Sequence, residues 1–220
     1  MTTTLPSVTA FRWVPPFAQG YVRDLRVRWA LEEAGRPYEA ELIDGTVKDS
    51  ADYRRRQPFG QVPAYRDGEV ELFESGAIVL HIAATSEALA PSDVSGRARV
   101  TTWVVAALNS VEPFVQNYVL PGIFHKGEAW VDGWRPHAER LLASRLEGLA
   151  GWLGERDWLE DRFTAGDLMM TTVLRELADT DLLARFPTLD AYRRRGEDRP
   201  AFGRALEAQL QAFRENAPPA

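Results

Sequence analysis

The sequence contains no cysteine among its 220 residues. This absence excludes disulfide bonds, cysteine-ligated metal sites and catalysis by a thiol of the protein itself. Histidine is also scarce, and the three copies, His81, His125 and His137, match no metal-ligand spacing. We therefore expect no metal centre. Any chemistry must use hydroxyl groups, carboxylates, arginines or a thiol that a ligand brings in.

Long apolar runs and a surplus of basic residues are missing as well. No run approaches the roughly 20 apolar residues that a membrane helix needs. The segment 1–6 has neither the basic patch nor the apolar core of a signal peptide. The net charge of −6 is unlike that of a typical nucleic-acid-binding protein. We expect a cytoplasmic protein that binds neither membranes nor nucleic acid.

The composition that remains is that of an ordinary globular protein, with 45% hydrophobic and 26% charged residues. A chain of this length is long enough for two modest domains. Polar residues and a proline mark a linker at 87–93, between a first domain at 1–86 and a second at 94–220.

The first domain alternates strand and helix patterns. β-Branched and aromatic residues indicate strands, and an Asp67-Gly68 pair between two of them is typical of a hairpin. The expected order is β-α-β-α-β-β-α, with strands at 8–14, 37–43, 62–66 and 70–73. The first helix follows Gly20 and ends near Ala34, and the others run from Thr46 to Gln57 and from about Glu74 to Ala84.

The second domain contains only helical patterns, in which apolar residues recur every three or four positions. Pro113 falls inside the first of these helices, where a kink is expected. Further helices are expected around 134–152, from Thr164, from Thr188 and after Pro200. The sequence thus predicts an all-α bundle.

Two short segments have features of a ligand site. Pro63 opens a predicted strand, where it cannot donate a ladder hydrogen bond; a plain loop proline is the alternative. Glu74 and Ser75 fall at a predicted helix N-terminus, whose N–H groups and positive dipole favour a ligand carboxylate. Because Glu74 can pair with an ammonium group, an amino-acid head such as a γ-glutamyl group fits both charges. Ordinary helix capping is the alternative here.

These segments resemble those of cytosolic glutathione transferases, notably the phi and omega-like groups. The resemblance extends over nearly the whole chain in the right order and is carried by the segments Arg26–Glu39, Gln57–Ala64, Glu74–Ile78, Phe163–Leu168, Pro187–Tyr192 and Arg199–Phe202. It implies an α/β thioredoxin-like N-terminal domain, which binds glutathione, and an all-α helical-bundle C-terminal domain. Phe163–Leu168 resembles the buried capping box of the family.

The resemblance also implies which residues bind glutathione. The peptide bond before Pro63 would be cis, so that the backbone of Val62 pairs with the cysteinyl backbone of the tripeptide. Gln61, Glu74 and Ser75 would hold the γ-glutamyl end. The glycine carboxylate would meet Arg56, with Lys48 as second choice; a solvated helix face is the alternative for Arg56. The implied glutathione site comprises Arg56, Gln61, Val62, Pro63, Glu74 and Ser75.

The residue that activates the thiol departs from the family pattern. A free thiol has a pKa of about 8.5, which a hydroxyl donor and a helix N-terminus can lower. Counting back from Arg26 by the family spacing leads to Tyr21 as the catalytic residue. In the alternative, Tyr21 only packs, and backbone N–H groups or Arg23 hold the thiolate; Gln19 is a weaker candidate.

The expected reaction is conjugation of glutathione, as co-substrate, to a small apolar electrophile, as in detoxification. Relatives are homodimers, so a homodimer is expected. Without cysteine, thiol-exchange reactions through a protein mixed disulfide are not expected. The alternative is a non-catalytic ligand- or protein-binding protein of the same fold. Aromatic residues predicted to line a second-substrate pocket between the domains are Phe17, Trp103, Phe114 and Tyr118, although such residues are more often part of a core.

Overall fold

The computed structural model describes residues 5–218. Residues 1–4, which are part of the segment examined for a signal peptide, and residues 219–220 lie outside the described part. The chain divides into two compact units. The first consists of the chain up to Leu89 and again from Arg199 onward, and the second runs from Ala90 to Asp198.

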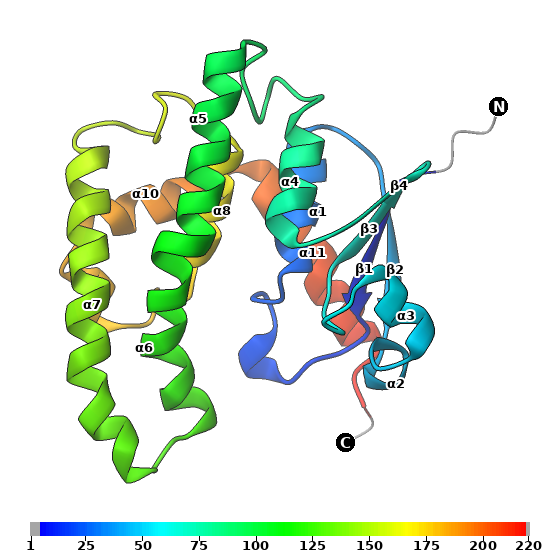
Figure 1. The fold of residues 1–220 in the computed structure, drawn as a ribbon. Coiled ribbons are helices and arrows are strands. Elements are labelled where there is room, and N and C mark those ends of the chain that lie inside the picture. The colour runs from blue at the N-terminus through cyan, green and yellow to red at the C-terminus, as the bar shows by residue number, and fades with distance from the viewer. Residues whose placement is uncertain (1–4, 219–220) are drawn as a thin grey trace. The chain divides into compact units, whose positions relative to one another are not determined.

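A mixed four-stranded sheet forms the centre of the first unit. Its strands are β1 (Ser7–Phe11), β2 (Glu39–Ile43), β3 (Ala64–Asp67) and β4 (Val70–Phe73), in the order β2-β1-β3-β4 (Figure 1). β1 and β2 are parallel, whereas β1–β3 and β3–β4 are antiparallel. Parallel neighbours need a crossover connection, which a helix supplies here, while the antiparallel pair β3–β4 is closed by the short turn at Asp67 and Gly68.

The helices of this unit cover both faces of the sheet. Figure 1 shows α1 (Asp24–Glu33) and α4 (Ser75–Ala83) on one side, and α2 (Gly45–Lys48) and α3 (Ala51–Arg56) on the other. A short 3-10 turn, η1 (Pro16–Ala18), lies between β1 and α1. The predicted order β-α-β-α-β-β-α and the thioredoxin-like fold are confirmed.

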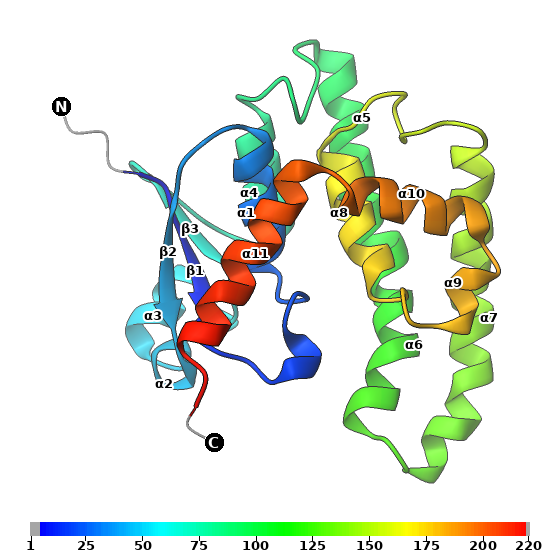
Figure 2. The same cartoon turned by 180° about the vertical axis from the view of Figure 1, so that it is seen from behind.

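The last helix, α11 (Pro200–Glu215), packs against α1 (Figure 2). The rings of Trp29 and Phe202 meet edge to face with centroids 4.9 Å apart. Gln209 donates a hydrogen bond to the carboxylate of Asp24 over 2.7 Å. Sequence periodicity shows that one face of this helix is buried but not what covers it, so the sequence alone groups the helix with those of the second domain. The contacts correct this boundary and group α11 with the first unit.

Within its described residues, the regular elements of the second unit are all helices, as predicted. Its elements are α5 (Val94–Val105), η2 (Ala106–Val111), α6 (Glu112–Phe124), α7 (Ala129–Leu153), α8 (Ala165–Arg175), α9 (Asp181–Ala184) and α10 (Pro187–Glu197). The central element is α8, which contacts α5 and α10 and in which all residues from Ala165 to Leu174 are buried. α6 and α7 lie side by side.

The kink expected at Pro113 takes the form of a widened turn. The six-residue segment η2 is π-helical and directly precedes α6, in which Pro113 occupies the first turn. Proline has no N–H, and its ring collides with the carbonyl four residues earlier. A π-helical turn just before it accommodates both effects without ending the helix. None of the helices within residues 5–218 combines the length and apolar character needed to cross a membrane.

Candidate functional site

The peptide bond between Val62 and Pro63 is cis, as the family resemblance implies. The side chain of Gln61 is exposed, whereas Val62 is buried. Val62 belongs to an apolar cluster with Tyr53 and two further residues, and Val22 packs against that cluster. The segment therefore has an anchored side chain at Val62 next to an exposed position.

The loop that leads to this segment is held by its own polar groups. Gln57 is buried, and its side-chain oxygen accepts a hydrogen bond from the Phe59 N–H over 2.8 Å. Arg54 donates to the carbonyl of Pro58. Gly60 has a φ of 61°, and a Cβ there would lie 3.0 Å from the Arg54 guanidinium. Glycine is therefore the residue that fits this turn.

The junction of β4 and α4 has an unusual backbone. Glu74 precedes the helix with a φ of 69°, which is uncommon for a residue with a side chain, and its carboxylate makes no capping hydrogen bond. Ser75 is buried, and its hydroxyl accepts a hydrogen bond from Arg26 over 3.4 Å. Because the first N–H groups of a helix have no partner within it, this uncapped end suits a ligand carboxylate.

The turn before α1 carries the predicted catalytic residue. Tyr21 is 43% exposed, and its backbone N–H donates to the carbonyl of Ala18. The next residue, Val22, packs against the cluster that contains Val62. One turn further along, Arg26 donates to Ser75. The start of α1 therefore contacts both of the other predicted glutathione-binding segments.

Arg26 was not singled out by sequence reasoning. It is 3% exposed, and Asp24 and Arg28 in the same helix are buried as well. An alternation of charged residues at the start of a helix is typical of a solvated face. The one available signal is that Arg26 precedes the buried Trp29 by three positions, which places both on one side of the helix.

Both basic residues predicted to bind the glycine carboxylate of glutathione form ion pairs with carboxylates of the protein itself. Arg56 forms a two-fold ion pair with Glu41 in β2, over 3.0 and 2.9 Å. This pair raises the pKa of Arg56. Lys48 contacts Asp49 over 2.6 Å. A glutathione carboxylate would have to compete with these carboxylates, and its contact with Arg56 stays a prediction.

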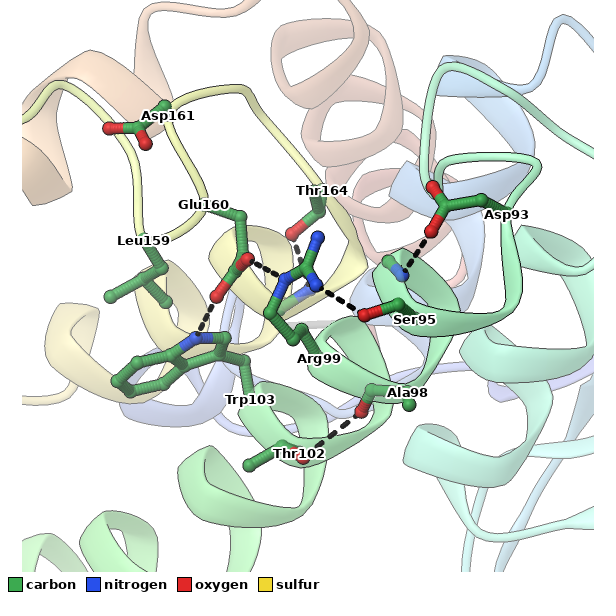
Figure 3. A network of polar contacts seen from close by, with 12 residues as sticks. Asp93, Ser95, Ala98, Arg99, Thr102, Trp103, Leu159, Glu160, Asp161 and Thr164 are labelled. Atoms are coloured by element: carbon green, nitrogen blue, oxygen red, sulfur yellow. Dashed lines mark hydrogen bonds and ion pairs between the residues drawn. The ribbon is translucent and has the colours of Figure 1, made fainter.

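Trp103, predicted for the second-substrate pocket, is bound within the helical unit. Its indole N–H donates to Glu160 over 2.9 Å, and its ring lies 5.3 Å from that of Trp152. Figure 3 shows Glu160 between Trp103 and Arg99, whose guanidinium donates to the second carboxylate oxygen over 2.6 Å. The indole N–H of Trp103 is thus already hydrogen-bonded to a carboxylate of the protein.

The other predicted pocket residues also have defined surroundings. The guanidinium of Arg145 lies over the ring of Phe114, 4.5 Å from its centroid. Tyr118 is buried and accepts a hydrogen bond from Arg135. Phe17 lies in η1 of the first unit and is exposed. The pocket that these residues were predicted to share stays a prediction.

The described residues offer no metal site. Within 5–218, no three histidine, aspartate or glutamate side chains are grouped so as to hold an ion. The features of the site are instead a bare helix N-terminus, an exposed tyrosine and a surface segment beside a cis-proline.

Comparison with known proteins identifies the family. A family model described as "Glutathione S-transferase, N-terminal domain" matches residues 17–84. The protein "Probable glutathione S-transferase GSTF2" of Oryza sativa subsp. japonica is 31% identical over 176 residues, which cover 74% of this chain and 78% of the relative. The chain belongs to the glutathione S-transferase family. Glutathione S-transferase F9 of Arabidopsis thaliana is 32% identical over 162 residues, covering 70% of this chain and 73% of its own.

Solved transferase structures share the fold. Poplar glutathione transferase F1 superposes with a TM-score of 0.79 at 23% identity, covering 94% of this chain and 99% of its own. A glutathione transferase from Burkholderia graminis, solved with two glutathione molecules per subunit, gives 0.80 at 22% identity and covers 93% and 88%. These structures confirm a thioredoxin-like domain followed by a helical one.

Proposed function

We propose that this family member joins the sulfur of glutathione to a small apolar electrophile. The observation that carries the proposal is the position of the start of α1. Val22 packs on the cluster of Val62, and Arg26 contacts Ser75. The turn with Tyr21 therefore lies next to both segments predicted to bind the tripeptide. Glutathione bound by relatives of the same fold supports this assignment.

In this proposal the three segments divide the recognition of glutathione. The N–H groups at the start of α4 receive the γ-glutamyl carboxylate, and Glu74 pairs with the ammonium group. The backbone of Val62 pairs with the cysteinyl residue. The sulfur then lies toward the N-terminus of α1, where the helix dipole and the Tyr21 hydroxyl favour the thiolate over the thiol.

The chemical step needs little more than an ionised sulfur held beside its partner. The thiol loses its proton to solvent, and the thiolate attacks the electrophilic carbon. A carbon–sulfur bond forms, while a leaving group departs or an electron pair moves onto the electrophile. Proximity and thiol activation supply the rate enhancement.

We expect Tyr21→Phe to reduce the ratio of thiolate to thiol in bound glutathione at pH 7 by roughly 10-fold, because removing a hydroxyl donor that lowers the thiol pKa by one unit has this effect. The ultraviolet absorbance of the thiolate, titrated with pH in wild type and variant, measures it. Arg23→Ala serves as the comparison. Unchanged ionisation in Tyr21→Phe would assign the activation to Arg23 or to the helix N-terminus. A wild type that does not bind glutathione would favour the non-catalytic alternative.

We further propose that the protein is a homodimer in which Phe59 contacts the second copy. Phe59 is 63% exposed, and it meets the exposed ring of Phe73 edge to face, with centroids 6.1 Å apart. Aromatic side chains are more frequent at interaction sites than on the rest of a protein surface.

Phe59→Asp is expected to convert the dimer to monomer at micromolar concentration, because each of two symmetric copies loses roughly 2 kcal/mol of contact. Sedimentation velocity measures this change. The matched control is Phe124→Asp, at a residue that is 62% exposed in α6. A monomeric wild type, or equal dissociation of both variants, would contradict the assignment of Phe59.

A further inference from the structure

Two buried hydroxyl groups lie beneath the segment that contains Val62 and Pro63. Thr9 in β1 has no exposed surface, and Tyr53 in α3 is 3% exposed. Their side-chain oxygens are 2.8 Å apart, although 44 positions separate them in sequence. A buried hydroxyl without a hydrogen-bond partner lowers the stability of the fold, and here each hydroxyl is a partner of the other.

Each hydroxyl also binds one backbone group of the loop. The Tyr53 hydroxyl donates to the carbonyl of Gln61 over 2.7 Å. The N–H of Ala64 donates to the Thr9 oxygen over 2.6 Å. Gln61 immediately precedes Val62–Pro63 and Ala64 immediately follows it. The two side chains therefore hold the segment at both of its ends.

The hydrogens of these groups have one consistent arrangement. A hydroxyl has a single hydrogen, and that of Tyr53 is used on Gln61, so Thr9 must donate to Tyr53. The hydrogen bonds then run in one direction, from the Ala64 N–H through Thr9 and Tyr53 to the Gln61 carbonyl. A longer contact of 3.3 Å from Thr9 to the Ala64 carbonyl competes for the same hydrogen. Burial raises the pKa of Tyr53, which keeps its hydroxyl protonated at neutral pH.

On the side of β1, the sheet does not hold this segment, although Ala64 still pairs with Phe73 of β4. The pairing of β1 with β3 ends at Val8 and Tyr65. At the next position the Thr9 side chain, and not a strand carbonyl, takes the N–H of Ala64. Pro63 has no N–H to offer. The hydroxyl pair thus holds the chain just beyond the last pair of the β1–β3 ladder.

Val62 itself is left available. Among residues 5–218, neither its N–H nor its carbonyl takes part in a hydrogen bond, while its side chain is buried in the cluster with Tyr53. An extended peptide pairs with a backbone that presents both groups in a fixed plane. Holding the flanking groups of Gln61 and Ala64 fixes that plane.

We propose that Thr9 and Tyr53 are positioning residues for glutathione, which set the backbone of Val62 for pairing with the cysteinyl residue of the tripeptide without touching it. The proposal rests on the proposed function, because it names the residues that prepare the same site. It predicts that loss of either hydroxyl weakens the binding of glutathione more than it affects the electrophile or the chemical step.

The test uses Tyr53→Phe and Thr9→Val, which remove one oxygen each and keep the shape of the side chain. Thr9→Ser keeps the oxygen and should bind as wild type does. The control is Tyr65→Phe in β3, a tyrosine that is 1% exposed and whose hydroxyl contacts Asp67 over 3.3 Å. This control removes the hydroxyl of another buried tyrosine and leaves intact the hydrogen-bonded pair of Thr9 and Tyr53, which we call the bridge.

We expect Tyr53→Phe and Thr9→Val each to raise the glutathione Kd and KM by about 3- to 10-fold, as for the loss of one hydrogen bond. The KM for the electrophile and kcat should change less than about 2-fold, since the bridge acts through the backbone alone. The double variant should bind glutathione no more weakly than the single variant with the lower affinity, because either substitution interrupts the same chain of hydrogen bonds. The Ala64 amide should exchange faster in the ligand-free variants, but not in Tyr65→Phe.

Normal glutathione affinity in both bridge variants, or an equal loss in Tyr65→Phe, would overturn the positioning role while wild-type binding still supports the proposed function. The same conclusion would follow if Thr9→Ser bound glutathione as weakly as Thr9→Val, or if the hydrogen exchange of the Ala64 amide were the same in the bridge variants as in wild type. Failure of the wild type to bind glutathione in calorimetry would overturn the proposed function and this role with it.

Discussion

Replacing Arg28 by methionine should lower the free energy of unfolding by about 3–5 kcal/mol, the usual loss when a buried ion pair is left with one partner. Arg28 donates to Asp24 over 2.7 Å, and the two side chains are 3% and 0% exposed. Methionine fills much of the space but leaves the carboxylate without its countercharge. Urea denaturation at pH 7.5 measures the difference from wild type.

The loss should depend on pH in a defined direction. Burial raises the pKa of Asp24, and Arg28 partly offsets this effect, so the variant has a still higher folded-state pKa. The folded variant then binds a proton that the unfolded chain, with an ordinary pKa of about 3.9, releases. Its deficit is therefore largest above the raised pKa and shrinks as the pH falls toward 4.

The control for this prediction removes the charge that causes the loss. Asp24→Asn in the Arg28→Met background keeps an oxygen for the hydrogen bond from Gln209. It should recover part of the stability at pH 7.5 and make the remaining deficit independent of pH. A deficit in Arg28→Met that is the same at pH 5 and pH 7.5 would show that packing, and not the buried charge, is what the variant lost.

Local patterns were sufficient for most of the fold. The Asp67-Gly68 pair predicted the hairpin that joins β3 and β4, and strand and helix periodicities gave the order of elements in the first unit. The hairpin and the periodicities depend on neighbours in sequence, so they can be read from the sequence directly. The cis peptide bond before Pro63, which the structure contains, was implied by the family resemblance.

Features that depend on distant partners could not be read in the same way. The resemblance implies that Arg56 binds the ligand, but its guanidinium forms an ion pair with Glu41 in strand β2. The oxygens of Thr9 and Tyr53 meet across 44 positions. Neither contact leaves a local periodicity, because pairing between elements is decided by how they pack and not by the spacing within each of them.

The capping box at the start of α8 combines both kinds of information. The resemblance of Phe163–Leu168 to a capping box implies that Thr164 caps the helix and that Asp167 reaches back to it, and both contacts are present. The structure adds two partners that the motif does not contain. Asp167 also accepts hydrogen bonds from the N–H of Leu159 and from the hydroxyl of Tyr192, each over 2.9 Å. One buried carboxylate therefore joins a loop, a helix start and α10.

Asp167→Ala should accordingly lower the free energy of unfolding by about 3–5 kcal/mol, because it leaves several buried donors without an acceptor. Asp190→Ala is the matched control: Asp190 also lies in the first turn of a helix, but it is partly exposed and pairs with Arg193 and Arg194, so its loss should cost under about 1 kcal/mol. Denaturant unfolding compares the two, and hydrogen exchange at the Leu159 amide reports the local effect. Equal losses in the two variants would mean that the additional partners of Asp167 contribute nothing, and that the residue acts as an ordinary helix cap.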